Sequence, residues 1–237
     1  MDFDELWPGG PRFPADGGSF RVSTDSVLLA HFAARIRARR VLDLGCGSGV
    51  LAVLLGLSHP GAAIEAIDIQ PDAASRAACA MAENGLSPAL VRCGDLRGHR
   101  ALYAAGSFDL VVCNPPYFPV GGGASAPDPA RAAAREERCC TLEDVCTAAA
   151  YLTRWGGALA LVHRPERLSA LCCALTRVGL EPKRLRLVQP RPGSAPNLLL
   201  LEARRGGKPG LDLEKPLLLT DADGRESEEV RAIYHRK

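Results

Sequence analysis

The chain has little net charge, no apolar run at its start and no visible internal repeat. Its 237 residues carry a formal charge of +2, with a pI of about 8.1, so nucleic-acid binding would have to come from local clusters of Arg and Lys. Residues 1–10 include three acids and no apolar run, which predicts neither a signal peptide nor a membrane span. We therefore expect a cytoplasmic protein, and the sequence gives no sign of an obligate protein partner.

The nine cysteines follow neither a disulfide framework nor a metal-binding spacing. Their number is odd, and several, such as Cys113, fall inside apolar runs typical of strands and helices. Cys139-Cys140 and Cys172-Cys173 are adjacent pairs, which is poor geometry for two ligands of one metal ion. The sequence predicts a reducing, intracellular setting and no metal site.

With 47% hydrophobic residues, the chain is long enough to bury one α/β core, and we expect a single domain over residues 1–237. Short apolar runs alternate with longer runs of helical period, which indicates βαβ units and a mostly parallel sheet. The expected strands are 40–44, 63–68, 89–93, 108–113 and 158–163. The expected helices are 26–37, 50–57, 71–84, 142–155 and 165–178.

The last third of the chain departs from this alternation. Residues 184–189 and 197–203 are strand-like runs joined by a Pro/Gly turn, which predicts an antiparallel hairpin. Together these elements predict a Rossmann-like α/β fold with a seven-stranded, mostly parallel sheet. We expect three additions to it: an N-terminal extension with a helix (1–38), a substrate lid (118–138), and a C-terminal extension ending in a helix (205–237).

The first expected strand of the sheet ends in a glycine loop, Asp43-Leu44-Gly45-Cys46-Gly47-Ser48-Gly49. Glycines allow a sharp turn and let a ligand approach the backbone without interference from a Cβ atom. The carboxylate of Asp43 would repel a pyrophosphate here but would favour a cation. The loop therefore fits S-adenosylmethionine (SAM), whose sulfonium and amino group are positive, better than it fits a dinucleotide.

Two further acids follow the neighbouring strands. Asp68 lies about 20 residues after Gly49, the separation expected for a ribose-binding acid, and Asp95 is a candidate acceptor for the adenine amine. Doubly wound sheets bind ligands at the carboxyl ends of strands near the switch in strand order, which places these acids, the loop and Asn114 on one rim. As an alternative, the loop is an ordinary tight turn and Asp68 a helix cap.

The fourth expected strand ends in Asn114-Pro115-Pro116-Tyr117. A planar amine delocalises its lone pair, and two acceptors pulling on its N–H bonds would turn that lone pair out of the plane. The Asn114 side-chain oxygen and the Pro115 carbonyl are suitable acceptors, because Pro116 biases Pro115 toward a stiff, extended backbone. Tyr117 offers a ring face for stacking a base. The tetrapeptide predicts methyl transfer to a planar nitrogen, mainly by orientation; a simple turn with Tyr117 in the core is the alternative.

Three segments, residues 20–29, 41–49 and 108–117, together resemble the class I SAM-dependent methyltransferases. Within this class the chain is similar to the bacterial tRNA1(Val) (adenine(37)-N6)-methyltransferase family, and the resemblance covers nearly all residues. The second and third segments are shared by many amine methyltransferases. The first segment, with Ser23-Thr24-Asp25 at the start of a helix, is the one that indicates the tRNA branch.

The resemblance implies an enzyme that transfers methyl from SAM to the N6 of an adenine in tRNA, releases S-adenosylhomocysteine and needs no metal. It implies that Asn114, Pro115, Pro116 and Tyr117 are catalytic and hold the adenine. The cofactor contacts implied or expected beside them are Thr24, Asp25, Asp43, Gly45, Gly47, Gly49, Asp68, Ile69, Asp95, Leu96 and Asn114. Helix capping explains Thr24 and Asp25 equally well.

The Gly/Ala/Pro-rich lid contains three arginines that fall on one face if the segment is helical: Arg131, Arg135 and Arg138. We expect them to contact RNA phosphates, which position RNA without reading its sequence. Because glutamates are interleaved with them, a solvated face is the alternative. Arg184 and Arg186 are weaker candidates of the same kind.

Other activities stay open at this stage. A glutamine N5-methyltransferase acting on a release factor uses the same chemistry, because a side-chain amide is also planar. Such enzymes usually carry a helical domain before the glycine loop, whereas 40 residues precede Val41 here. A ribosomal RNA guanine-N2 enzyme and a DNA adenine enzyme are further candidates. A silent SAM- or RNA-binding module would be expected to lose the acceptors at Asn114.

Overall fold

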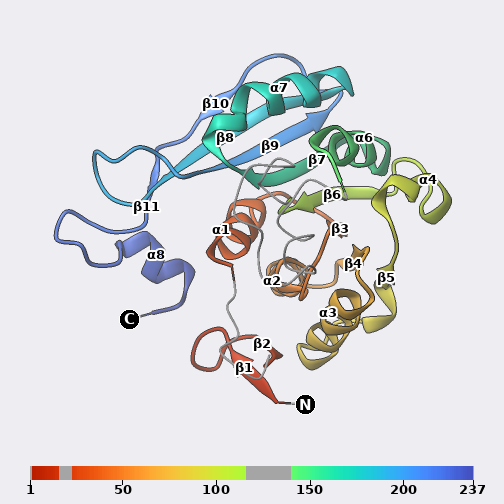
Figure 1. Ribbon diagram of the computed structural model, residues 1–237, viewed down its shortest axis with the longest axis horizontal. Helices are drawn as coiled ribbons and strands as arrows, with labels where there is room; N and C mark the ends of the chain where they lie inside the picture. Colours follow the sequence, from red (N-terminus) through yellow and green to blue (C-terminus); the bar gives the residue numbers. More distant parts are fainter. Residues whose placement is uncertain (1, 16–22, 116–139, 237) are drawn as a thin grey trace, which may run out of the picture.

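The computed structural model of the protein describes residues 2–15, 23–115 and 140–236. In this part of the chain a nine-stranded sheet has the order β10-β8-β9-β7-β6-β3-β4-β5, with β11 also paired to β8 (Figure 1). Its longer strands are β3 (Arg40–Leu44), β4 (Ala63–Asp68), β5 (Val91–Cys93), β6 (Phe108–Cys113), β7 (Thr153–His163), β8 (Leu180–Gln189) and β9 (Leu198–Arg205). The two-residue strands β10 (Asp212–Leu213) and β11 (Leu217–Leu218) lie along β8.

The strand order reverses at β3, and the strand directions change at β9. Strands β3 to β7 are parallel to one another, whereas β9 is antiparallel to both β7 and β8. The chain runs outward from β3 to β4 and β5 and then returns to β6 on the other side of β3. The predicted fold class is confirmed, because a mostly parallel sheet ends in the expected antiparallel hairpin. The two short strands beside β8 were not predicted.

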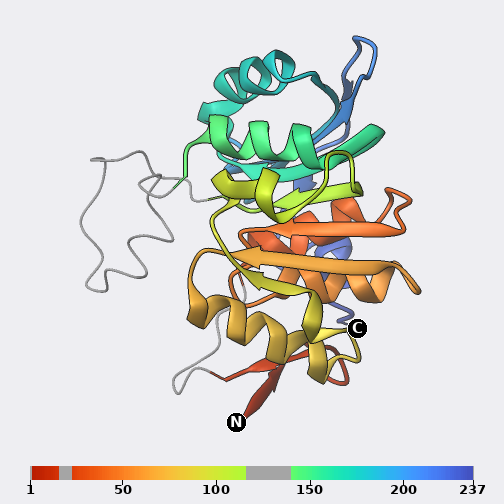
Figure 2. The same ribbon diagram turned by 90° about the vertical axis from the view of Figure 1, so that its right-hand side faces the viewer.

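Helices cover both faces of the sheet (Figures 1 and 2). The longer ones are α1 (Thr24–Ala33), α2 (Val50–Ser58), α3 (Pro71–Glu83), α6 (Leu142–Leu152) and α7 (Leu168–Arg177). Val41 of β3 belongs to the core under α1, α2 and α3, and its neighbour Leu42 belongs to the core under α6 and α7. Because both faces of the strands are buried, the strands are continuous apolar runs, and this made them predictable.

Some boundaries differ from the prediction. Helix α6 ends at Leu152, and β7 starts at Thr153, well before the expected residue 158. The early part of β7 pairs with β6 through a register shift between Phe108 and Leu110. Residues 154–156 there are exposed, so this part of the strand has no apolar pattern. Strand β8 likewise begins at Leu180, ahead of the expected residue 184.

Small elements at the two ends complete the fold. A hairpin of β1 (Phe3–Glu5) and β2 (Arg12–Pro14) packs against the end of α3, where Asn84 exchanges two hydrogen bonds with the Arg12 backbone (Figures 1 and 2). The short helix α8 (Glu228–Ile233) follows the sheet. Among the described helices, none is both long and apolar enough to span a bilayer. The predicted lid at 118–138 lies outside the described residues.

Candidate active site

A cavity of about 400 Å³ lies at the carboxyl ends of β3, β4, β5 and β6, where the strand order switches. Its walls come from the glycine loop, from the turns after β4 and β5, and from the starts of α1 and α6. The volume lies in the usual range for small-molecule sites. Eight of the residues predicted from the sequence line it: Gly45, Gly47, Asp68, Ile69, Asp95, Leu96, Asn114 and Pro115.

The glycine loop is bound to the end of β4. Gly45 and Gly47 have φ angles of +76° and +54°, a left-handed backbone that L side chains rarely adopt. The Gly47 N–H donates to Asp68 Oδ2 at 2.8 Å, and the Gln70 N–H donates to Asp68 Oδ1 at 2.9 Å. These bonds hold the Asp68 carboxylate against the cavity wall and fix the shape of the loop around it.

Gly49 occupies a tightly packed position, and its predicted cofactor contact stays a prediction. It does not line the cavity. A Cβ atom at this position would lie 2.9 Å from the Ala77 Cα, at a φ of +83°. Gly49 therefore lets the start of α2 pack closely against α3.

Asp43 is fully buried at the end of β3 and is not among the residues that line the cavity. Its Oδ2 accepts a hydrogen bond from the Ala52 N–H at 3.1 Å, while its Oδ1 has no partner among the described residues. Burial raises the pKa of Asp43 to about 8, against the opposing effect of the Ala52 bond, and the nearby Asp68 raises it further. A cation near Asp43 would favour its charged form.

These groups fit SAM. The carboxylate of Asp68 supplies acceptors beside the glycine backbone, and Asp43 behind the loop has a buried oxygen that lacks a partner in the described part of the chain, so a cation would favour its charged form. Both features suit a ligand with two cationic groups and ribose hydroxyls. Asp68 would bind the ribose, and Ile69 and Leu96 line the same cavity. Within the described ranges, no cluster of three His, Cys, Asp or Glu side chains is placed to bind a metal ion.

Asp95 is engaged in the structure by its neighbour in sequence. It caps a short 3₁₀ turn by accepting from the Arg97 N–H, and its carboxylate also pairs with the Arg97 guanidinium. This pairing lowers the pKa of Asp95. To bind an adenine amine, Asp95 would have to share its carboxylate with Arg97.

Asn114 reaches the cavity from the end of β6 and is held by a residue that sequence reasoning missed. Its Nδ2 donates to Ser26 Oγ, on α1, at 2.9 Å. Ser23 and Ser26 line the cavity, whereas Thr24 and Asp25 between them do not. The cavity wall is thus formed by the flanking serines rather than by Thr24 and Asp25, because helix rotation decides which residues face the cavity. Only the predicted helix start pointed to this region.

Five of the predicted residues lie outside the described part of the chain: Pro116, Tyr117, Arg131, Arg135 and Arg138. Their roles stay predictions.

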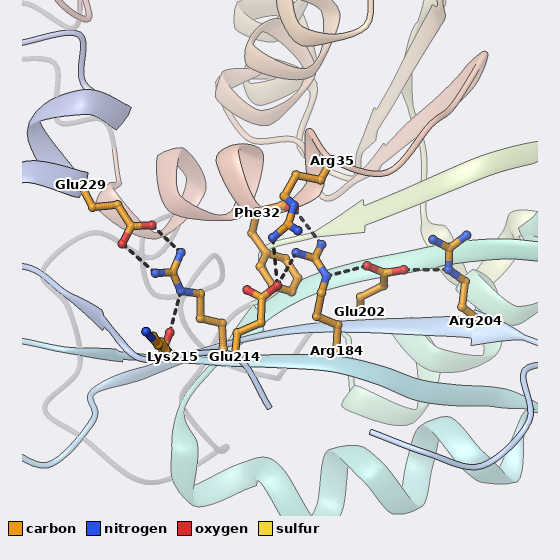
Figure 3. Close-up of polar contacts among 9 residues, drawn as sticks. Phe32, Arg35, Arg184, Glu202, Arg204, Glu214, Lys215 and Glu229 are labelled. Carbon is orange, nitrogen blue, oxygen red and sulfur yellow. Dashed lines mark hydrogen bonds and ion pairs between the residues drawn. The ribbon is translucent and has the colours of Figure 1, made fainter. Parts of the chain in front are cut away.

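Arg184 and Arg186 are described, and they are structural. Arg184 Nε donates to Glu202 at 2.9 Å, and its Nη1 donates to Glu214 at 3.2 Å (Figure 3). Both terminal nitrogens of Arg186 donate to the Glu229 carboxylate. Their side chains are only 13% and 15% exposed, so the prediction that they bind RNA phosphates is wrong.

Comparison with known proteins agrees with this geometry. The model of the methyltransferase small domain matches residues 22–167. The chain belongs to this family. The resemblance to class I SAM-dependent methyltransferases is thereby confirmed, and the protein is an enzyme whose cofactor is SAM.

Three individual proteins illustrate the relationship. The chain is 34% identical, over 92% of its length and 90% of the relative's, to the tRNA1(Val) (adenine(37)-N6)-methyltransferase of Tolumonas auensis. It is 32% identical, over 84% of its length and 71% of the relative's, to the release factor glutamine methyltransferase of Deinococcus radiodurans. A predicted O-methyltransferase from Agrobacterium tumefaciens, Atu636, has the same fold, with a TM-score of 0.72, 22% identity and coverage of 90% of this chain and 96% of that one.

Proposed function

We propose that this protein transfers the methyl group of SAM to the exocyclic N6 of an adenine in tRNA, at position 37 of tRNA1(Val). One observation carries the proposal: Asn114 and Pro115 line the same cavity as the glycine loop and Asp68. An amine held by the first pair would therefore lie beside a cofactor held by the second. The name of the relative from Tolumonas auensis supports the choice of tRNA and of the nucleotide.

The chemistry required of the protein is orientation. Bound SAM supplies an electrophilic methyl group on its sulfonium. Asn114 Oδ1 and the Pro115 carbonyl would accept the two N–H bonds of the adenine amine and turn the nitrogen lone pair out of the ring plane. Attack by that lone pair would form the N–C bond while the C–S electron pair left with sulfur, and the acidic product nitrogen would then lose a proton to water. Holding the amine in this geometry supplies most of the rate gain.

A release factor glutamine is the second candidate substrate, because its amide needs the same two acceptors and the relative from Deinococcus radiodurans bears that name. Identity and coverage both favour the tRNA branch. The cytoplasmic location stays a prediction, as does tRNA as the only macromolecular partner.

Methyl transfer from labelled SAM separates these candidates. Unfractionated tRNA lacking the modification and a bacterial release factor are incubated in parallel with the enzyme, and labelled RNA is digested to nucleosides for mass analysis. We expect the label in tRNA as N6-methyladenosine. Label on protein glutamine, or as N2-methylguanosine in RNA, would contradict the proposal.

A further inference from the structure

Helix α1 brings a hydroxyl group to the acceptor end of the cavity. Asn114 and Ser26 are 88 residues apart in sequence, and the Asn114 Nδ2 donates to the Ser26 Oγ at 2.9 Å. Both residues line the cavity. The hydroxyl is therefore in contact with the side chain expected to orient the methyl acceptor.

A primary amide presents different chemistry on its two edges. Its oxygen accepts hydrogen bonds, whereas its NH2 group only donates them. An adenine amine also donates, so only the oxygen edge of Asn114 can orient it. With Nδ2 donating to Ser26, the NH2 edge faces α1 and Oδ1 lies on the other edge of the same planar group.

Helix α1 is itself anchored, which makes Ser26 a fixed reference point. Val27 and Leu28 are buried in the core beneath it. Near the other end of the helix, the Arg184 Nη2 donates to the Phe32 carbonyl at 2.8 Å, and the guanidinium lies 3.7 Å from the centroid of the Phe32 ring (Figure 3). A site held by a packed element keeps its geometry better than one held by a loop.

A purely local role for Ser26 does not fit the contacts. The N-cap of α1 is Ser23, and Ser26 lies inside the helix. The Ser26 hydroxyl accepts a hydrogen bond from Asn114, which directly follows β6 and is not part of α1. We propose that Ser26 is a positioning residue, which holds the Asn114 carboxamide with its oxygen toward the methyl acceptor. This inference rests on the proposed function.

The first test is a set of three variants. Ser26→Ala removes the hydroxyl and is expected to lower kcat about tenfold, the size of one lost hydrogen bond, while SAM affinity and the KM for tRNA stay unchanged. Ser26→Thr keeps a hydroxyl and is expected to recover most of the activity. Ser169→Ala, an exposed serine on α7, is the matched control and is expected to behave as wild type. Thermal unfolding checks that all three fold.

A double-mutant cycle then asks whether Ser26 acts through Asn114. If it does, adding Ser26→Ala to Asn114→Ala costs no further activity in single-turnover assays with labelled SAM. An equal further loss in that background would overturn the inference. So would a Ser26→Ala enzyme that keeps full kcat, or one that loses SAM affinity in calorimetry, because Ser26 would then be a cofactor contact.

The design keeps this inference apart from the proposed function. Wild-type transfer to tRNA is measured first, and its absence contradicts the proposed function. The cycle is run on whichever substrate the wild-type enzyme modifies, since a glutamine amide needs the same acceptor. An active wild type with an unaffected Ser26→Ala variant contradicts only the role of Ser26.

Discussion

The two sides of the cavity are built in different ways. On the cofactor side, the contacts join adjacent strand ends: the Gly47 N–H binds Asp68, 21 residues away. On the acceptor side, Ser26 binds Asn114 across 88 residues, and Arg184 reaches the Phe32 carbonyl across 152. The cofactor side is thus encoded in local motifs, whereas the acceptor side depends on how α1 packs against the C-terminal strands.

The largest expected effect tests the anchor of α1. Arg184→Met leaves Glu202, which is 7% exposed, with only the more exposed Arg204, and it also leaves the Phe32 carbonyl without this donor, so it should lower the free energy of unfolding by about 3 kcal/mol. The control is Arg35→Met, because Arg35 pairs with Glu214 as Arg184 does but is 70% exposed. We expect that control to change stability by less than about 1 kcal/mol in urea unfolding. Equal losses in the two variants would show that burial does not matter.

A second pair of variants separates the two sides by function. Asn114→Ala should reduce turnover by about two orders of magnitude with SAM affinity nearly intact, because a positioning contact is lost. Asp68→Ala should weaken SAM binding first, by about tenfold or more, because a charged acceptor is lost. Calorimetry and single-turnover rates measure the two quantities. If both variants lose affinity and rate equally, the division of the cavity is wrong.

A third comparison isolates the packing role of Gly49. Gly49→Ala introduces both a left-handed alanine and a clash with Ala77, whereas Gly61→Ala has a similar φ of +81° and no atom within 4 Å. Gly49→Ala should therefore lose about 1–3 kcal/mol more stability than Gly61→Ala. Urea unfolding of both variants measures the difference. Equal losses would mean that α2 and α3 accommodate the added methyl group without a loss of stability.

The last comparison is a change in the slope of stability with pH, which is small over any single pH unit. The folded pKa of Asp43 is about 8, far above its unfolded value, so burial stabilises the protonated form. That contribution is fully present below about pH 4 and is lost as the pH rises toward 8, by at most about 1.4 kcal/mol per pH unit. Asp43→Asn should flatten this dependence in unfolding experiments. Saturating SAM should flatten it in the wild type, and an unchanged slope in Asp43→Asn would remove Asp43 as its source.

The sequence revealed more of the cofactor side than of the acceptor side. Strands β3, β4 and β6 were predicted to the residue, because burial on both faces leaves uninterrupted apolar runs. The start of β7 was missed, since Trp155 and the glycines after it carry no strand pattern. Gly49 was recognised as a loop glycine, but its contact with Ala77 depends on helix packing.

The residues around α1 show where sequence reasoning stops. The helix start was found, but its rotation toward the cavity was not, so Thr24 and Asp25 were predicted at the cavity wall, where the structure has Ser23 and Ser26. Arg184 was predicted as an RNA contact because the sequence did not show its ion pairs: its partners, Glu202 and Glu214, lie far from it along the chain. Such pairings depend on tertiary packing and leave no local pattern.

The most direct test of the account is methyl transfer to a transcript of tRNA1(Val), compared with the same transcript carrying guanine at position 37. The account predicts one methyl group per molecule, recovered as N6-methyladenosine, on the first transcript and none on the second. Equal labelling of the two transcripts, or a product other than N6-methyladenosine, would contradict it.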